Sequence, residues 1–166
     1  MGLSTPMPAR QLPRVKAARN AAEFPPRLSS GYQVRDAHRA FQRLLERRIA
    51  PYGVTRGQWY FLRVLWITDG LSQRDLSARV GMMEPTTVIA LRSMEKSGLI
   101  RRVRGDDDRR KVLVFLTAKA KRLRGELLAV ARIITDEAEE GIAPRDLAAF
   151  RRIVARMTKN LDRIER

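Results

Sequence analysis

The chain of 166 residues suits one domain with an appendage, and its 44% hydrophobic residues can form a buried core, which excludes a wholly disordered protein. Its 34 Lys and Arg residues against 18 Asp and Glu give a net charge of +16, so we expect a polyanionic partner, nucleic acid first. Cysteine is absent, which excludes disulfides, thiol catalysis, thiol-based redox sensing and cysteine-ligated metal sites. Neither a membrane-spanning run nor a signal-peptide pattern is visible, so a cytoplasmic location is expected.

Residues 1–30 differ in composition from the rest of the chain. They hold five of the eight prolines, and residues 1–22 contain basic residues but no acidic ones. Such a segment cannot bury enough apolar surface to offset its ordering entropy, so we expect a mobile arm. An inert tail and an arm that follows DNA are both open interpretations. An organelle transit peptide, which is also rich in arginine and poor in acids, ranks lower.

Apolar residues recur at helical spacing from residue 31 onward, and capping and breaking residues divide this pattern into four helices. Thr55 and Gln58 have the spacing of a capping box, in which each side chain bonds the backbone N–H of the other residue. Ser72 is a second N-cap, Gly81 ends the helix that Ser72 opens, and Pro85 suits a first helical turn. The expected helices cover about residues 31–50, 55–67, 72–81 and 85–97.

The pattern changes at residue 99. Two runs, 99–104 and 111–116, contain β-branched or alternating residues and flank the polar turn 105–110, which predicts a hairpin with a charged tip. Thr117 then caps a long helix to about residue 140, and Pro144 opens a last helix with an apolar stripe. The predicted order is four helices, a hairpin and two helices.

Two short helices joined at Gly81 and followed by a basic hairpin describe a winged helix-turn-helix, a mainly α fold with a small β-hairpin wing. The second helix of such a pair fits the major groove of DNA, while the hairpin can reach the neighbouring backbone or the minor groove. Residues 101–111 carry six basic and three acidic residues. A charged hairpin by itself could equally be a solvated surface, but its place directly after the helix-turn-helix favours DNA.

Four stretches carry a resemblance to a known family. They are Leu76–Gly81, Pro85–Val88, Met94–Ile100 and the wing stretch Asp108–Thr117, with its Asp-x-Arg and Leu-Thr pattern. Over roughly residues 31–165 the chain resembles the MarR family of bacterial transcription regulators. The resemblance implies a homodimer whose first and last helices interlock and which binds a palindromic operator. Many members are repressors that small, often aromatic, anionic ligands release from DNA.

The composition of the N-terminus and the resemblance together divide the chain. A basic, Pro-rich arm (1–30) precedes a MarR-type domain (31–166). Within this domain we expect a DNA-binding lobe over about residues 55–116. The dimerisation helices are expected at about 31–50 and 117–165.

The helix that Pro85 opens is the expected recognition helix. The residues that share one face and should pack on the core are Thr87, Ala90, Leu91 and Met94. The outward residues expected to read bases are Thr86, Val88, Ile89 and Arg92, with Ser93 beside them. Family members often carry a polar residue and an arginine where Val88 and Ile89 stand. Outward aliphatic side chains suit thymine methyl groups, and the alternative is that Val88 or Ile89 packs inside.

Contacts with phosphate and with the minor groove are expected from two further sets of residues. Ser72, Gln73 and Arg74 lie at a helix N-terminus, where free N–H groups and a partial positive charge attract phosphate. The wing tip supplies Asp108, Arg109, Arg110 and Lys111. The family motif indicates that Arg110 enters the minor groove, braced by Asp108. Arg109 and Lys111 would then contact phosphates.

The resemblance also implies an effector site where the first, second and fifth helices approach one another. The matching residues are His38, Phe41, Tyr52, Trp59, Arg63 and Trp66. Trp59, Arg63 and Trp66 share one helix face, which would suit a small aromatic acid or its coenzyme A thioester. The alternative is a fully packed aromatic core, with His38 as a core or interface residue.

A second class of function stays open: a sequence-tolerant, nucleoid-associated or RNA-binding protein that uses the same charge without an effector. An enzyme is disfavoured, because the chain has no cysteine, one histidine and no phosphate-binding glycine loop. The acidic groups at 106–108 and 136–140 lack the spacing of a metal site, so we expect no metal and no cofactor.

Overall fold

The computed structural model of the chain describes residues 25–104 and 112–164. The predictions for the N-terminal arm up to residue 24 and for the wing tip at 105–111 therefore lie outside the described residues. The chain divides into two units, with the boundary between Arg39 and Ala40. Among the described residues, no helix is long and apolar enough to cross a membrane.

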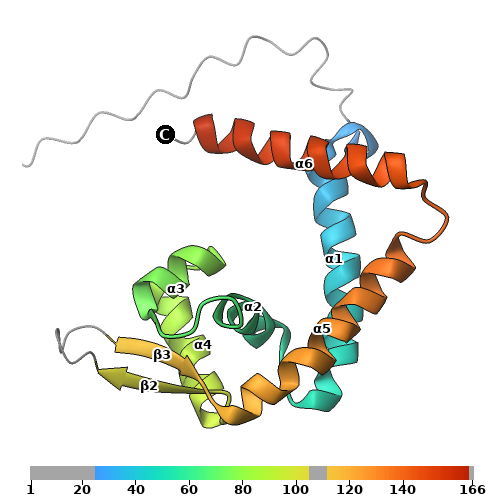
Figure 1. The fold of residues 1–166 in the computed structure, drawn as a ribbon. Coiled ribbons are helices and arrows are strands. Elements are labelled where there is room, and N and C mark those ends of the chain that lie inside the picture. The colour runs from blue at the N-terminus through green and yellow to red at the C-terminus, as the bar shows by residue number, and fades with distance from the viewer. Residues whose placement is uncertain (1–24, 105–111, 165–166) are drawn as a thin grey trace, which may run out of the picture. The chain divides into compact units, whose positions relative to one another are not determined.

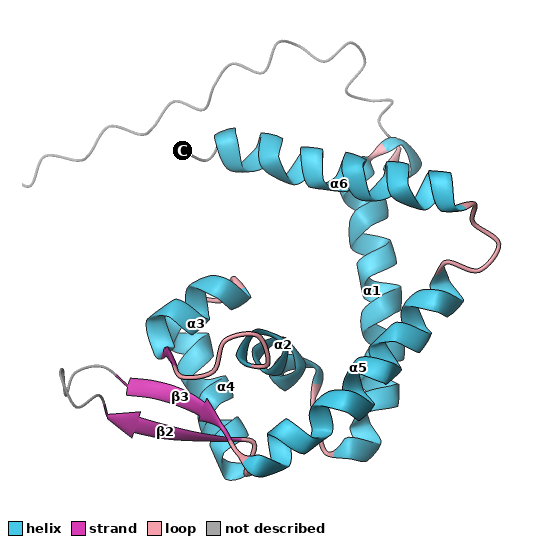
Figure 2. Ribbon diagram, in the orientation of Figure 1, coloured by secondary structure: helices cyan, strands magenta, loops and turns pink. Residues whose placement is uncertain are grey.

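Helices dominate the chain, and the strands form one small sheet (Figure 1, Figure 2). Over the described residues the elements are α1 (Ser30–Ile49), α2 (Arg56–Leu65), β1 (Leu71–Ser72), α3 (Gln73–Val80), α4 (Glu84–Lys96), β2 (Ile100–Arg104), β3 (Val112–Leu116), α5 (Ala118–Ala138) and α6 (Pro144–Ile164). Short 3-10 turns cover Pro26–Leu28 and Ala50–Tyr52. The predicted mainly α fold with a small β-hairpin is confirmed.

The unit that ends at Arg39 contains the first 3-10 turn and the first half of α1. The Gln33 side chain donates a hydrogen bond to the carbonyl of Arg27, and the backbone N–H of Tyr32 donates to Ser29 Oγ at 3.2 Å. The Arg35 guanidinium lies 4.5 Å from the centre of the Tyr32 ring. These local contacts begin α1 one residue before the predicted start.

Three strands form an antiparallel sheet in the order β1-β3-β2. The pairing of β2 with β3 begins with Ile100 opposite Leu116, which confirms the predicted hairpin. The short strand β1 adds Leu71 opposite Val114 on the other edge of β3. Sequence periodicity misses β1, because two residues are too few to show an alternation.

The core lies where α2, α3 and α4 pack against the sheet and the first half of α5 (Figure 1). Its most deeply buried side chains come from all of these elements and include Phe61, Leu62, Leu65, Leu76, Leu91, Met94, Leu99, Val114 and Leu127. Each such side chain contributes about 1.5–3 kcal/mol by leaving water. This shared core holds α4 and the hairpin together.

Gln58 joins α2 to α4. Thr55 Oγ1 accepts from the Gln58 N–H at 3.3 Å and Gln58 Oε1 accepts from the Thr55 N–H at 3.0 Å, so the predicted capping box is confirmed. The Gln58 side chain is buried, and its Nε2 donates to Ser93 Oγ at 3.2 Å and to Ser97 Oγ at 3.4 Å. One side chain therefore both caps α2 and attaches it to α4.

A second polar contact, between Ser77 and Thr87, joins α3 to α4. Thr87 Oγ1 donates to Ser77 Oγ at 3.1 Å, and Ser77 Oγ donates to the carbonyl of Met82 in the turn between the helices. Gly81 ends α3 in the left-handed conformation, as its predicted role as helix breaker requires. Because both hydroxyls are buried and satisfied, they hold the two helices in one arrangement.

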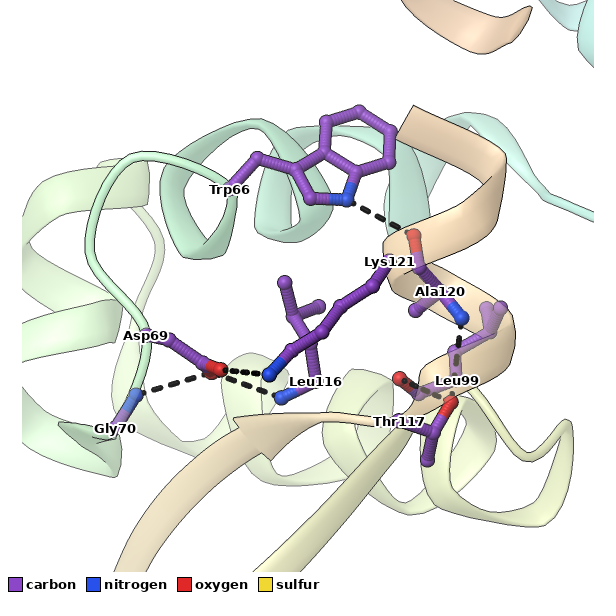
Figure 3. A network of polar contacts seen from close by, with 8 residues as sticks. All are labelled: Trp66, Asp69, Gly70, Leu99, Leu116, Thr117, Ala120 and Lys121. Atoms are coloured by element: carbon purple, nitrogen blue, oxygen red, sulfur yellow. Dashed lines mark hydrogen bonds and ion pairs between the residues drawn. The ribbon is translucent and has the colours of Figure 1, made fainter. Parts of the chain in front are cut away.

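Asp69 connects the sheet to α5 (Figure 3). Its Oδ1 accepts from the backbone N–H of Leu116 at 2.8 Å and of Gly70 at 3.1 Å, and its Oδ2 lies 3.2 Å from Lys121 Nζ. Leu116 ends β3, and Lys121 lies in the first turns of α5. One carboxylate therefore contacts both sides of the strand-to-helix turn.

Trp66 and Thr117 make further hydrogen bonds at this turn (Figure 3). The indole N–H of Trp66 donates to the carbonyl of Ala120 at 3.0 Å. Thr117 is the N-cap of α5, as predicted: its Oγ1 accepts from the Ala120 N–H at 3.2 Å and donates to the Gly98 carbonyl at 2.7 Å. The direction in which α5 leaves the sheet is thereby set by α2, α4 and the sheet together.

We expect Asp69→Ala to lower the free energy of unfolding by about 1–3 kcal/mol, because the partly buried N–H of Leu116 loses its acceptor. Asp69→Asn should cost less, since its carbonyl oxygen can still accept that bond. Lys121→Met should change stability by less than about 1 kcal/mol, because the lysine side chain of this ion pair is 61% exposed. Urea denaturation measures the three stability losses and checks their predicted order. Equal stability of the Asp69→Ala variant and the parent protein would contradict the role of Asp69.

Replacement by alanine should change the stability of the protein in opposite directions at two glycines. Gly125 lies inside α5 with nothing within 4 Å of an added Cβ, so Gly125→Ala should raise stability by about 0.5–1 kcal/mol. Gly70 has a φ of +77°, and a Cβ there would lie 2.7 Å from Phe115 Cε1, so Gly70→Ala should lower stability. Thermal melting of both variants is the measurement. Changes of the same sign would show that one of these local descriptions is wrong.

Candidate nucleic-acid interface

The exposed face of α4 is the candidate base-reading surface. The predicted inward residues Thr87, Leu91 and Met94 are buried, and Ala90 is partly buried. Ile89 is 69% exposed, whereas Val88 is half-buried at the edge of this face. The two aliphatic residues for which sequence reasoning left both orientations open thus differ.

Two polar side chains flank Ile89 on this surface. Thr86 and Arg92 are exposed, as expected. Ser93 is also exposed but already accepts a hydrogen bond from Gln58 at 3.2 Å. The outward face of α4 therefore presents one large aliphatic side chain between a hydroxyl and a guanidinium group. Their contact with DNA stays a prediction.

The N-terminus of α3 differs from the simple phosphate anchor that the sequence suggested. Ser72 Oγ accepts from the Asp75 N–H at 3.1 Å and donates to Asp75 Oδ2 at 2.7 Å, so this hydroxyl is engaged within the helix end. Gln73 is half-buried, and Arg74 is exposed. The carboxylate of Asp75 makes this helix end less attractive to an anion. Among the three predicted residues, Arg74 is the one with a charged, exposed side chain, and its contact with phosphate stays a prediction.

Basic side chains are nevertheless in excess around the helix-turn-helix. The exposed ones on α3, α4 and β2 are Arg74, Arg79, Arg92, Lys96, Arg101 and Arg104. Over the same elements the acidic residues are Asp75, Glu84 and Glu95. Arg101 stacks over the Phe115 ring at 4.7 Å, which orders its guanidinium at the base of the hairpin. The predicted contacts of Asp108, Arg109, Arg110 and Lys111 lie outside the described residues.

Arg102 is the hairpin arginine that forms hydrogen bonds and an ion pair with α4 in the described residues. Glu95 of α4 accepts from the backbone N–H of Arg102 at 3.2 Å and from its Nε at 2.9 Å, and Nη2 donates to the same carboxylate. The hydrogen bond from the Arg102 side chain holds the pKa of Glu95 below its usual value, so the carboxylate is charged at neutral pH. Arg102 was predicted only as one of the basic residues of the hairpin. No motif or spacing in the sequence indicates that it pairs with Glu95.

The predicted effector residues on α2 lie together, but they are closely packed. Trp59 and Trp66 are 6% and 7% exposed and meet edge to face, with ring centres 5.9 Å apart. The indole N–H of Trp66 is already bonded to Ala120, as described above. Arg63 is exposed, and its guanidinium lies 5.5 Å from the Trp59 ring centre.

The other predicted effector residues have different surroundings. Tyr52 is partly buried and packs against the core, and Phe41 is exposed. His38 is exposed on α1 in the unit that ends at Arg39. The described residues contain no cluster of histidine and acidic side chains that could hold a metal ion.

Comparison with known proteins places the chain in a family. A model of the MarR family matches residues 52–111, which include the helix-turn-helix and the first strand of the hairpin. The HTH-type transcriptional regulator TtmR of Methylorubrum extorquens is 34% identical over 96 residues, which cover 58% of this chain and 49% of TtmR. The match thus spans about half the length of that relative.

Solved structures match over a larger share of the chain. A MarR transcriptional regulator from Methanosarcina mazei is 28% identical with a TM-score of 0.75, and the match covers 81% of this chain and 96% of that one. A probable transcriptional regulator from Pseudomonas aeruginosa is 30% identical with a TM-score of 0.69, over 78% of this chain and 96% of that one. This chain therefore belongs to the MarR family, a family of transcriptional regulators and not of enzymes.

Proposed function

We propose that this chain binds double-stranded DNA and regulates transcription, with α4 in the major groove and the hairpin as a wing against the adjacent backbone. The exposed face of α4 carries this proposal. Ile89 is 69% exposed on a helix whose opposite face is packed against the core, so a partner can bury its aliphatic surface. Thymine methyl groups in the major groove are such a partner, and Arg92 can donate to guanine beside them.

A homodimer is part of the proposal. α6 has no buried residue, and its apolar side chains Phe150, Ile153, Leu161 and Ile164 are all more than half exposed. A second copy of the chain would cover this face. Two copies related by a two-fold axis would read a palindromic operator, with half-sites about one helical turn or ~10 bp apart.

A sequence-tolerant nucleic-acid binder is the alternative function, and the net charge of +16 favours it. The two functions differ in specificity. A specific regulator prefers its site over scrambled DNA by about 10³-fold or more, whereas a generic binder shows little preference.

The deciding experiment selects binding sites from random duplexes and then measures affinity for the selected and scrambled sequences at several salt concentrations. We expect a palindromic consensus and a large preference for it, with a dimeric mass in dilute solution. The absence of any consensus, or equal affinity for both duplexes, would support the generic binder. A monomeric mass would contradict the dimer.

We expect Ile89→Ala to weaken binding to the selected operator about tenfold, because a lost contact of this size is worth about 1–2 kcal/mol. Binding to scrambled DNA should change little, since phosphate contacts dominate it. Ile67→Ala is the matched control, because Ile67 is an 81% exposed isoleucine outside α4 and the hairpin. Equal losses on both duplexes, or the same effect from Ile67→Ala, would contradict base reading by Ile89.

The proposal extends to repression that a small aromatic acid or its coenzyme A thioester relieves. The exposed guanidinium of Arg63 above the Trp59 ring supports an anionic aromatic ligand there. The burial of Trp59 and Trp66 favours the packed-core alternative, so a ligand would have to separate side chains that are now in contact. Such a ligand releases DNA only if it binds the DNA-incompetent arrangement more tightly.

Thermal-shift screening of aromatic carboxylates and their thioesters, followed by operator release, tests this extension. We expect stabilisation by at least one compound, and Arg63→Ala should remove the response. No response to the whole panel, or an unaltered response of the Arg63 variant, would contradict the site. A reporter gene placed behind the selected operator separates repression from activation.

A further inference from the structure

Glu95 on α4 and Arg102 on β2 connect the helix proposed to read bases with the wing. The carboxylate accepts both from the side chain of Arg102, with Nε at 2.9 Å, and from its backbone N–H at 3.2 Å. Both side chains are partly exposed, at 38% for Glu95 and 28% for Arg102. The contact therefore holds the strand by its backbone as well as by its side chain.

The position of β2 in the sheet explains why this contact can fix the hairpin. In the order β1-β3-β2, the strand β2 lies at an edge, and an edge strand has N–H groups that no neighbouring strand pairs. Glu95 accepts the N–H of Arg102, so at this point α4 takes the place that a further strand would have. The hairpin is thus attached directly to α4, in addition to the apolar core beneath it.

We propose that Glu95 is a positioning residue for DNA recognition: with Arg102 it fixes the wing relative to α4, so that both elements can contact one operator. The inference rests on the proposed function. Arg104 is the described wing residue that the contact would place. It lies two residues beyond Arg102 on the same face of β2, is exposed, and its side chain makes no hydrogen bond or ion pair within the described residues.

Two simpler roles of this ion pair predict that removal of the Glu95 charge strengthens DNA binding. If Arg102 contacted phosphate directly, removal of the Glu95 charge would free its guanidinium and strengthen DNA binding. Net charge alone predicts the same result, because Glu95→Gln makes the protein one unit more positive. A positioning role predicts weaker binding in spite of the added positive charge.

The first measurement compares operator affinity of Glu95→Gln with that of Asp136→Asn in the full chain. Asp136 is the matched control, because its carboxylate also accepts from an arginine, Arg132 Nε at 2.9 Å, but on the exposed surface of α5. We expect Glu95→Gln to weaken binding to the selected operator about tenfold, which corresponds to about 1.4 kcal/mol. Asp136→Asn should bind as tightly as the parent protein or more tightly.

A double-mutant cycle with Arg104→Ala separates positioning from a general loss of stability. In the parent background Arg104→Ala should weaken binding and reduce the salt slope by about 0.9, the value for one phosphate contact. In the Glu95→Gln background it should cost little more, because the misplaced wing has already lost that contact. Thermal melting confirms that each variant is folded at the assay temperature. Additive losses would overturn the positioning role.

If Glu95→Gln does not fold, the operator affinity of Arg102→Lys tests the same proposal. Lysine keeps the charge but loses the planar fork, so a positioning role predicts weaker binding and a phosphate contact predicts retained binding. If the parent protein prefers its operator and both variants bind it as tightly, the inference is wrong and the proposed function stands. If the parent protein prefers no DNA sequence, the proposed function fails and the inference fails with it.

Discussion

The turn from β3 into α5 is the constraint on which the rest of the larger unit depends. Asp69 and Thr117 accept from backbone N–H groups there that neither the sheet nor the helix satisfies by itself, and Trp66 donates a further bond to the carbonyl of Ala120. Unpaired N–H and carbonyl groups at a partly buried turn are costly, so this arrangement has few competitors. Because α5 is 21 residues long, a small change of angle at the turn would move its far end by many ångströms.

The acidic residues of this basic chain have a structural role. Glu95 holds Arg102, Asp69 holds Lys121, and Glu137 lies 2.8 Å from Arg48 between α5 and α1. Each pair joins two elements, and each is partly exposed, so its contribution to stability is modest while its contribution to geometry is direct. With 34 basic residues and 18 acidic ones, many basic side chains have no acidic residue to pair with. The unpaired excess is the part of the charge that is available to a polyanion.

Residues that act through local backbone rules were predictable. The capping box of Thr55 and Gln58, the N-caps Ser72 and Thr117, and the helix stop at Gly81 all lie where the sequence placed them. These features depend on a few neighbouring residues, so no knowledge of the fold is needed. The inward face of α4 followed from helical spacing for the same reason. The two-residue strand β1 was not predicted, because its pairing partners lie more than 40 positions away in β3.

The sequence by itself determined the order of the helices and the hairpin, the family and the excess of positive charge, because spacing, capping and composition are properties of the chain. Only the tertiary structure decided which side chains are available for function. It assigned Arg102 to Glu95 and the Trp66 indole to Ala120, and it left Ile89 exposed while Val88 was half-buried. The reason is physical: a side chain's partners depend on distances between separate elements of the fold, which packing sets and local periodicity does not encode.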